Sequence, residues 1–305
     1  MDVLTREQLA ELHVPLAVAI GFFDGVHIGH QQVIVAAVEA AKRRQTKSVV
    51  ITFHQSPKII LGRTSHLGYL TPLPEKLRQF EALGVDYVLV LQFDETLLCL
   101  PPKAFIEDYL VHIGAEYVSV GFDFRFGHLG SGSADDLIKS AKFDVNVVPP
   151  IETNAQKVST SDIKKYMEAG GIERINALLA RRFTLSGTVL HGKKMGRTIG
   201  YPTANIAVSP DYLMTLRGVY ATLTEVKGKL YKSMTNIGHN PTMNHQKDVS
   251  VETHLLDFNG DLYDQPIRLE FITKIRDEKK FTDLEALKHA LAADKKFVEN
   301  LTINV

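Results

Sequence analysis

The hydrophobic pattern of the chain changes once, near residue 183, and this change constrains the fold more than any other feature. Before it, short apolar runs alternate with segments of helical spacing; after it, β-branched runs follow one another with only turn signals between them. The first pattern is typical of a parallel sheet covered by helices, and the second of an antiparallel sheet or small barrel. A length of 305 residues also fits two domains. We therefore predict one domain over residues 1–182 and another over 183–305.

The first predicted domain contains strands, each a short apolar run, with helices between them. The strands are expected over Leu16–Ile20, Ser48–Phe53, Asp86–Phe93 and Tyr117–Val120, and the helices over Gln31–Arg44, Pro74–Leu83 and Ala104–His112. A further helix over Ile163–Leu179 is expected to bridge the two domains. This order indicates an α/β fold with a parallel sheet.

The second predicted domain ends in an amphipathic helix. Short β-branched runs precede it, separated by turn signals such as Asn259-Gly260-Asp261. A capping box from Thr282 to Glu285 is expected to begin the helix, because its side chains can satisfy the free amides of the first turn. We predict a small antiparallel β-barrel with a C-terminal helix.

Composition argues against several classes of protein. Lys+Arg and Asp+Glu both total 35, and this balance indicates neither a nucleic-acid nor a membrane-surface partner. Cys99 is the one cysteine, so no intrachain disulfide can form, which is typical of a reducing compartment. The first residues lack the apolar core of a secretory signal, and no run approaches the ~18 apolar residues of a membrane span. We expect a cytoplasmic protein.

The segment from Gly21 to His30 is the most informative part of the first domain. It joins a predicted buried strand to a predicted helix, and an open sheet presents ligands at such junctions. The amides and positive dipole end of the helix favour phosphate there. His27 and His30 are three residues apart, so both can lie on one face of the first turn and donate hydrogen bonds to a phosphate. Taken alone, the segment is equally a glycine-rich turn with two surface histidines.

The wider motif resembles a known signature. Its H-x-G-H resembles that of the nucleotidyltransferase superfamily, and the string G-F-F-D-G-V-H-x-G-H resembles the flavin adenylyltransferase branch. The resemblance implies a Rossmann-like nucleotidyltransferase domain with a nucleotide-binding set and a catalytic pair. These are Gly21, Phe23, Asp24 and Gly25 for the nucleotide, and His27 and His30 for catalysis.

Two later segments resemble further parts of the same family. Residues 121–127 resemble G-x-D/N-F-R-F-G, which implies that Asp123 and Arg125 lie close to the nucleotide. Residues 158–164 resemble S-S-T-x-I-R, which implies that Ser159 and Thr160 meet the ATP phosphates. By themselves, the hydroxyl residues of the second segment are simply a good helix cap.

The chain departs from the adenylyltransferase pattern at two positions. The family carries T-F-x-P-H-P after the second strand, whereas here Ser56 stands at the histidine position and His54 two residues earlier. Lys164 replaces an arginine, which keeps the charge but loses the bidentate fork. These departures motivate an alternative in which adenylyl transfer is weak.

The second informative stretch runs from residue 187 to residue 205. Gly192, Gly196 and Gly200 recur at a spacing of four with basic residues between them, so their amides can wrap an anionic group. The loop is not a Walker A loop, because G-K-[ST] is absent. On spacing alone, a flexible basic hairpin loop is the alternative.

This stretch resembles the riboflavin kinase signature G-x-x-x-G-R-x-x-G-Y-P-T-A-N. The resemblance implies that a set of residues in and after the loop binds the nucleotide and that two oxygen-bearing side chains hold Mg²⁺. The nucleotide set is Gly192, Lys193, Gly196, Gly200 and Pro202, and the metal ligands are Thr203 and Asn205.

Later segments match the same family in order. Residues 236–242 resemble N-I-G-x-x-P-T, and residues 251–258 resemble V-E-x-H-x-x-D-F, whose glutamate is the catalytic base; the resemblance gives that role to Glu252. A carboxylate within an apolar strand must be paired, exposed on one face, or functional. Residues 275–281 resemble R-x-E-x-x-F, which implies that Arg276 lies near the flavin phosphate.

Together the motifs resemble the bacterial bifunctional riboflavin kinase/FAD synthetase family from about residue 16 to residue 300. The resemblance implies ATP-dependent phosphorylation of riboflavin to FMN and adenylylation of FMN to FAD, with Mg²⁺ as cofactor and ATP as co-substrate. The expected partners are the small molecules riboflavin, FMN, FAD and ATP.

Two alternatives remain open at this point. The first is a riboflavin kinase whose adenylyltransferase half is weak or inactive. The second is a flavin-binding regulator on an enzyme scaffold, against which Glu252 argues because a binder needs no base.

Overall fold

The structure is a computed structural model that describes the chain apart from residues 57–67, 154–155, 192–198, 240–248 and 304–305. The chain forms two compact units, Met1–Thr160 and Ser161–Val305. The functional boundary near residue 182 stays a prediction. No described helix is long and apolar enough to cross a membrane.

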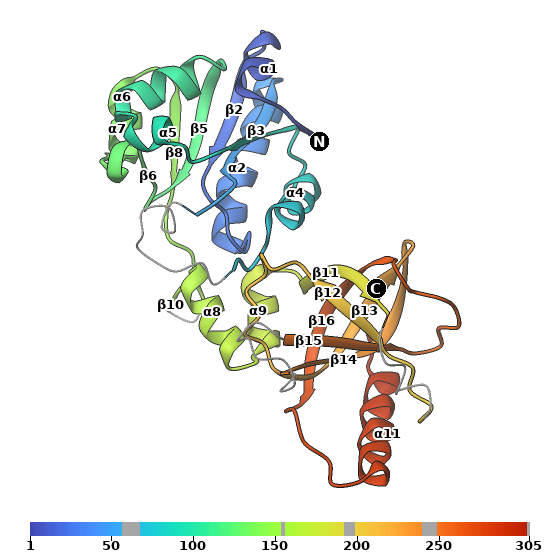
Figure 1. Cartoon of the computed structure of the whole chain (residues 1–305). Helices are drawn as coiled ribbons and strands as arrows, with labels where there is room; N and C mark the ends of the chain where they lie inside the picture. The colour runs from blue at the N-terminus through green and yellow to red at the C-terminus, as the bar shows by residue number, and fades with distance from the viewer. Residues whose placement is uncertain (57–67, 154–155, 192–198, 240–248, 304–305) are drawn as a thin grey trace. The chain divides into compact units, whose positions relative to one another are not determined.

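The first unit is built on a six-stranded parallel sheet in the order β1-β4-β3-β2-β5-β8. Figure 1 labels four of these strands, β3, β2, β5 and β8. The strands are β1 (Asp2–Val3), β2 (Leu16–Ile20), β3 (Lys47–Phe53), β4 (Tyr87–Leu91), β5 (Ala115–Gly121) and β8 (Asp144–Val148). The predicted parallel sheet is confirmed. The sequence pattern missed the edge strands, because β1 is too short to show a period and Asn146 interrupts the apolar run of β8.

Helices cover both faces of this sheet. They are α1 (Arg6–Glu11), α2 (Ile28–Arg44), α4 (Leu73–Ala82), α5 (Glu95–Cys99), α6 (Pro102–Phe105), the π-helical segment η1 (Ile106–Val111) and α7 (Ala134–Ser140). Val18 and Ala19, neighbours on β2, belong to separate hydrophobic clusters on the two faces. Burial on both faces explains why β2 is a continuous apolar run rather than an alternating one.

The strand order places a topological switch point at β2. The chain leaves β2 toward β3 and β4 on one side and later returns to add β5 on the other side. In open α/β sheets the crevice outside the carboxyl ends of such strands is the usual ligand site. The two conspicuous glycine motifs begin here, at Gly21 after β2 and at Gly121 at the end of β5.

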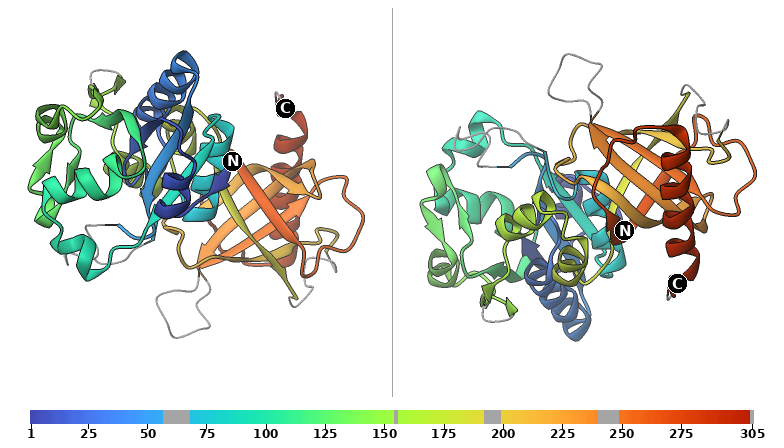
Figure 2. Two further views of the ribbon diagram at one scale, coloured as in Figure 1. Left: turned by 90° about the horizontal axis from the view of Figure 1, so that it is seen from above. Right: turned by 90° about the horizontal axis from the view of Figure 1, so that it is seen from below.

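The second unit is a closed antiparallel barrel in the order β11-β12-β15-β14-β13-β16. The strands are β11 (Phe183–Leu190), β12 (Ala204–Val208), β13 (Gly218–Val226), β14 (Lys229–His239), β15 (Val249–Leu255) and β16 (Pro266–Arg276). Helix α11 (Leu284–Asn300) packs on the outside of the barrel (Figure 2). Val298 of this helix belongs to one hydrophobic cluster with Met234 and Leu256 of the barrel domain. The predicted barrel with a C-terminal helix is confirmed.

Two local predictions were wrong in detail. The expected helix over Ile163–Leu179 is two helices, α8 (Thr160–Glu168) and α9 (Ile172–Leu179), because Gly170 takes a positive φ of 71° that ends the first one. The N-cap of α11 is Asp283, which accepts a hydrogen bond from the Ala286 amide, and not Thr282. An aspartate is at least as good a cap as a threonine, so the helix begins one residue later.

We expect α9 to be part of the folding unit of the barrel. The amide nitrogen of Asn176 donates to the Phe271 carbonyl at 2.8 Å, and its oxygen accepts from the Phe183 amide at 2.7 Å. Ile175 and Leu178 are buried as well. The free energy of unfolding, measured in urea, should therefore be larger for a fragment of residues 161–305 than for a fragment of residues 183–305, by at least about 3 kcal/mol. Equal urea midpoints for the two fragments would contradict this.

Candidate functional site

The turn between β2 and α2 is an unusual piece of backbone. Phe23, Gly25 and Val26 take positive φ angles of 56°, 88° and 42°. Of these three residues, only glycine adopts a positive φ without steric cost. The turn is held in place by burial and by the Gln31 side chain, which donates to the Val26 carbonyl at 2.9 Å. Strained backbone of this kind persists where surrounding contacts over-determine it, and it concentrates at functional sites. We call residues 21–30 the histidine turn.

His27 is the N-cap of α2 rather than a residue of its first turn. Its Nδ1 accepts a hydrogen bond from the His30 amide at 3.3 Å, so in the neutral ring the proton is assigned to Nε2. The His27 and His30 rings are stacked, with centroids 3.6 Å apart and planes 16° from parallel. The two imidazoles therefore lie side by side, as predicted, but His27 precedes the first turn in which the prediction had placed it.

Both imidazoles are held in the neutral form. Burial lowers the pKa of His27 to about 4, and the Asp123 carboxylate offsets only part of that effect. Burial also holds the pKa of His30 well below its ordinary value, with the charges of His27 and Lys76 acting in the same direction. The His30 Nδ1 atom is buried and has no hydrogen-bond partner among the described residues. Neutral rings of this kind can donate N–H groups to an anion that binds at the helix end.

Asp24 ties the histidine turn to two distant segments. Its side chain accepts a hydrogen bond from the Thr71 amide at 3.1 Å, and its carbonyl accepts one from the Thr160 hydroxyl at 3.1 Å. The contact with Thr160 brings the predicted phosphate-binding hydroxyls beside the predicted histidines. Gly21 has no room for a side chain, since an added Cβ would lie 2.8 Å from the Phe23 ring.

Phe23 faces the core rather than an open site. Its side chain is 3% exposed and makes edge contacts with Phe80 and His30. Its assignment to the nucleotide stays a prediction.

Of the two predicted site residues in the motif of residues 121–127, Asp123 acts on the histidines through its charge. The Asp123 carboxylate pairs with the Lys157 ammonium at 3.2 Å, and the charges of both act on the pKa of His27. Arg125, at the start of the short strand β6 (Arg125–Phe126), is exposed. Sequence reasoning missed Lys157 and the buried Lys76, because no spacing rule separates them from ordinary surface lysines.

In the barrel, the strand register places the predicted catalytic base, Glu252, beside the predicted metal ligand Asn205. Glu252 on β15 is directly opposite Asn205 on β12 and opposite Asn236 on β14. Residues opposite each other on antiparallel strands share a face, so the carboxyl group lies between two amide side chains. Glu252 is partly buried, and this burial raises its pKa. A raised pKa makes a carboxylate a better proton acceptor.

The segment before β12 contacts the histidine of the V-E-x-H-x-x-D-F motif, to which the sequence analysis gave no role. The Nδ1 of His254 lies 2.8 Å from the Pro202 carbonyl, and the His254 ring meets Tyr201 edge-on. Thr203 is exposed, and Gly200 takes a φ of 85°. The remaining predicted loop residues, Gly192, Lys193 and Gly196, lie outside the described residues.

Arg276 is held by α11. Its Nε and Nη2 atoms donate to the buried Asp294 carboxylate at 2.8–3.0 Å, and its Nη1 donates to the Asp277 carbonyl at 3.2 Å. The structure therefore assigns it an anchoring contact that the sequence did not indicate. Its role at the flavin phosphate stays a prediction.

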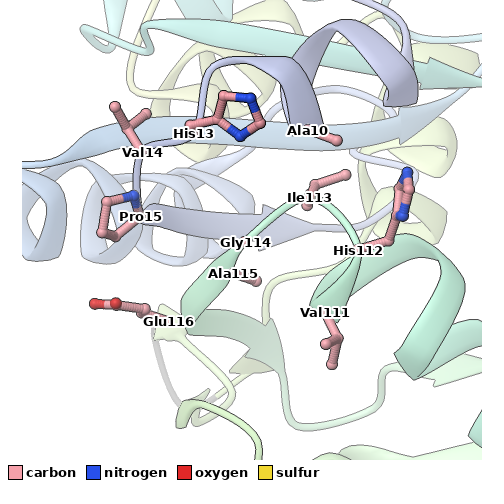
Figure 3. A pocket seen from close by; sticks show the side chains of 10 residues that line it. All are labelled: Ala10, His13, Val14, Pro15, Val111, His112, Ile113, Gly114, Ala115 and Glu116. Atoms are coloured by element: carbon pink, nitrogen blue, oxygen red, sulfur yellow. The ribbon is translucent and has the colours of Figure 1, made fainter.

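A pocket of about 390 Å³ lies at the opposite edge of the parallel sheet (Figure 3). Its lining includes Pro15 and Glu116, beside the amino ends of β2 and β5, together with the exposed His13 and His112. Ligands of open α/β sheets bind at the carboxyl ends instead, and no predicted site residue lines this pocket. We therefore place the candidate site at the histidine turn.

The neutral histidines predict acid sensitivity of the first unit. Since His27 is protonated in the unfolded chain below about pH 6.5 but in the folded chain only near pH 4, the unfolded state binds the extra proton between these values. Stability is therefore expected to fall by roughly 3 kcal/mol as the pH drops from 6.5 to 4. His27→Asn keeps a good N-cap without the titration, so its urea-unfolding free energy should show less of this loss. An identical pH dependence in both proteins would refute the prediction.

Comparison with known proteins gives two family matches that divide the chain. A model of FAD synthetase matches residues 10–162, and a model of riboflavin kinase matches residues 179–302. A bifunctional riboflavin kinase/FMN adenylyltransferase from Listeria monocytogenes is 39% identical over 279 residues, which are 90% of this chain and 89% of the relative. The enzyme of the same description from Bacillus subtilis is 37% identical, over 91% of this chain and 89% of the relative.

A solved structure agrees with the fold. The crystal structure described as a macrolide-efflux protein from Streptococcus pneumoniae has a TM-score of 0.89 and 29% sequence identity to this chain. The alignment covers 98% of this chain and 99% of that chain. The likeness shows that the two chains share one fold over nearly their whole length.

Proposed function

The chain belongs to the family of bifunctional riboflavin kinase/FMN adenylyltransferases, and from this premise we propose which of its residues carry each reaction. It phosphorylates riboflavin to FMN and adenylylates FMN to FAD, with ATP as co-substrate in both steps. The first unit carries adenylyl transfer and the barrel carries phosphorylation.

For adenylyl transfer, the stack of two neutral imidazoles at the amino end of α2 carries the proposal. The phosphate of FMN attacks the α-phosphorus of ATP, and pyrophosphate leaves. His27 and His30 donate hydrogen bonds to the phosphate oxygens as negative charge builds up on them. The phosphate of FMN is already a competent nucleophile, so this step needs no general base.

Backbone and hydroxyl groups around the histidine turn would bind the nucleotide. Gly21, Asp24 and Gly25 lie in the turn itself, and Thr160 donates its hydroxyl hydrogen to the Asp24 carbonyl. Ser159, Asp123 and Arg125 complete the proposed set for this unit.

For phosphorylation, Glu252 accepts the proton of the ribityl 5′-hydroxyl as that oxygen attacks the γ-phosphorus of ATP. The supporting observation is its position between Asn205 and Asn236, partly buried and with a raised pKa. Phosphoryl transfer needs mainly positioning and charge stabilisation, so no covalent enzyme intermediate is required.

We propose Mg²⁺ for the kinase site, with Thr203 and Asn205 as its protein ligands. Among the described residues, no group of three or more His, Cys, Asp or Glu side chains could hold a metal ion. A hydroxyl and an amide oxygen nevertheless suit Mg²⁺, which prefers oxygen ligands and usually binds few protein groups beside substrate phosphates. When bound, it would neutralise charge on the transferred phosphate.

A time course with riboflavin, ATP and Mg²⁺, followed by chromatography of the flavins, tests the proposal. We expect FMN to appear first and FAD to follow. Accumulation of FMN without FAD would favour the kinase with an inactive first unit, an alternative that gains no support from the comparisons. If riboflavin stays unchanged, both the bifunctional enzyme and the kinase with an inactive first unit are rejected.

A further inference from the structure

A buried lysine lies beneath the histidine turn and has no task in the proposed mechanism. Lys76, on α4, is only 2% exposed, although lysine is almost never fully buried. Burial lowers its pKa to about 8, against the favourable charge of Asp24. Burying a cation costs free energy that an apolar side chain of the same size would not. A lysine at this position therefore indicates that its charge or its N–H donors have a role there.

The contacts of Lys76 join the carboxyl ends of two strands. Its Nζ donates to the Phe22 carbonyl at 2.9 Å, directly after β2, and lies 3.4 Å from both the Thr52 hydroxyl and the Phe53 carbonyl at the end of β3. The Thr52 hydroxyl also donates to the Phe22 carbonyl, at 3.1 Å. The histidine turn thus leaves the sheet from a point that is fixed by the lysine.

The aromatic ring of Phe22 adds a second contact. The Lys76 ammonium lies 4.2 Å from the centroid of this ring, at cation–π distance. Main chain and side chain of Phe22 are therefore both held by one group. Since Phe23 follows with a positive φ, a fixed Phe22 leaves the strained part of the turn little freedom.

Lys76 also acts on the histidines through its charge. The titratable groups around it are Asp24 of the turn, which favours the charge of Lys76, and His30 of α2, whose protonation Lys76 opposes. His27 opposes protonation of His30 as well. On α4 itself, the buried carboxyl group of Glu75 accepts a hydrogen bond from Gln79 at 2.9 Å.

We propose that Lys76 is a positioning residue for adenylyl transfer, which fixes the start of the histidine turn through its contacts with Phe22 and, through its charge, acts on His30. Lys76 is only 2% exposed and its nearest contacts are with Phe22 at the start of the turn, so it acts through the turn. The inference rests on the proposed role of the two histidines.

Lys76→Met tests this, because methionine fills similar space without the charge or the donors. In the full-length enzyme we expect kcat for FAD formation from FMN and ATP to fall by up to about 10²-fold, as small misplacements of catalytic groups do. The pKa of His30, read from its imidazole resonances by NMR, should rise, and the acid limb of the rate profile should move to higher pH with it. Phosphorylation of riboflavin by the same preparation should be unchanged and reports the amount of intact barrel, while a wild-type urea-unfolding transition reports that the first unit, which contains Lys76, is folded.

Two further variants act as controls. Arg78→Met removes an exposed positive charge two residues away on α4 and should change neither kcat nor the pKa of His30. Lys76→Arg keeps the charge and the donors, so His30 should titrate as in the wild type. If Lys76→Met fails to fold, Lys76→Gln removes the charge and keeps N–H donors; the pKa of His30 should rise in it, and an unshifted pKa would overturn the proposal.

A wild-type kcat in Lys76→Met would overturn the proposal. So would a loss of rate that is equal at every pH with an unshifted His30, since that is the signature of packing alone. Failure of the underlying mechanism looks different: variants of His27 and His30 would then make FAD at the wild-type rate, whatever Lys76→Met does.

Discussion

Replacement of both stacked imidazoles, His27→Asn with His30→Ala, is expected to stop FAD formation while FMN still accumulates from riboflavin. Loss of an oriented donor to a charged transition state costs about 10²–10³-fold per group. The two losses need not add, because residues that act as a unit are non-additive. The asparagine introduced by His27→Asn would still cap α2, so the loss of rate would not be a loss of the helix.

The measurement is a time course with riboflavin, ATP and Mg²⁺ for the wild type and the double variant. The barrel carries its own substrate site, so its rate of FMN formation is the control within each reaction. If the variant makes FAD as fast as the wild type, the histidines do not take part in catalysis. The single variant His27→Asn shows how much of the effect depends on the N-cap histidine.

Glu252→Gln is expected to reduce riboflavin phosphorylation by roughly 10²–10⁴-fold, the usual contribution of a general base. Glutamine keeps the size of the side chain and its place between Asn205 and Asn236. Because burial raises the pKa of Glu252, ionising it costs folding free energy at neutral pH. The variant should therefore be at least as stable as the wild type, which separates a chemical effect from unfolding.

The assay follows FMN production from riboflavin, with FAD production from supplied FMN as the control. The second reaction should survive, since its proposed residues lie in the other unit. Near-wild-type phosphorylation would remove Glu252 from the mechanism. Equal loss of both reactions would indicate damage beyond the barrel site.

The folds of both units followed from local patterns. The run Leu16–Ile20 is apolar at every position, which is typical of a strand buried on both faces. The β-branched runs after residue 183, separated by turn signals, indicated the barrel. The motifs at Gly21 and Gly121 could also be placed, because parallel strands bring their carboxyl ends to one edge. Such features depend on neighbours in the chain, and a sequence displays them directly.

Local detail was less accurate where two signals competed. Gly170 divided an expected helix, and Asp283 took the cap that Thr282 was expected to provide. In both cases the sequence contained the competing residue, and only the final backbone shows which one prevails.

The sequence by itself determined the two fold types, the family and the residues that carry its motifs. Tertiary structure alone decided that His27 and His30 stack as neutral rings, that Glu252 lies between two asparagines, and that Lys76 is buried beneath the turn. Ring stacking, lateral strand register and burial depend on contacts between residues far apart in the chain. Charge state follows from that burial, because desolvation sets the pKa of an ionisable group once its surroundings are assembled.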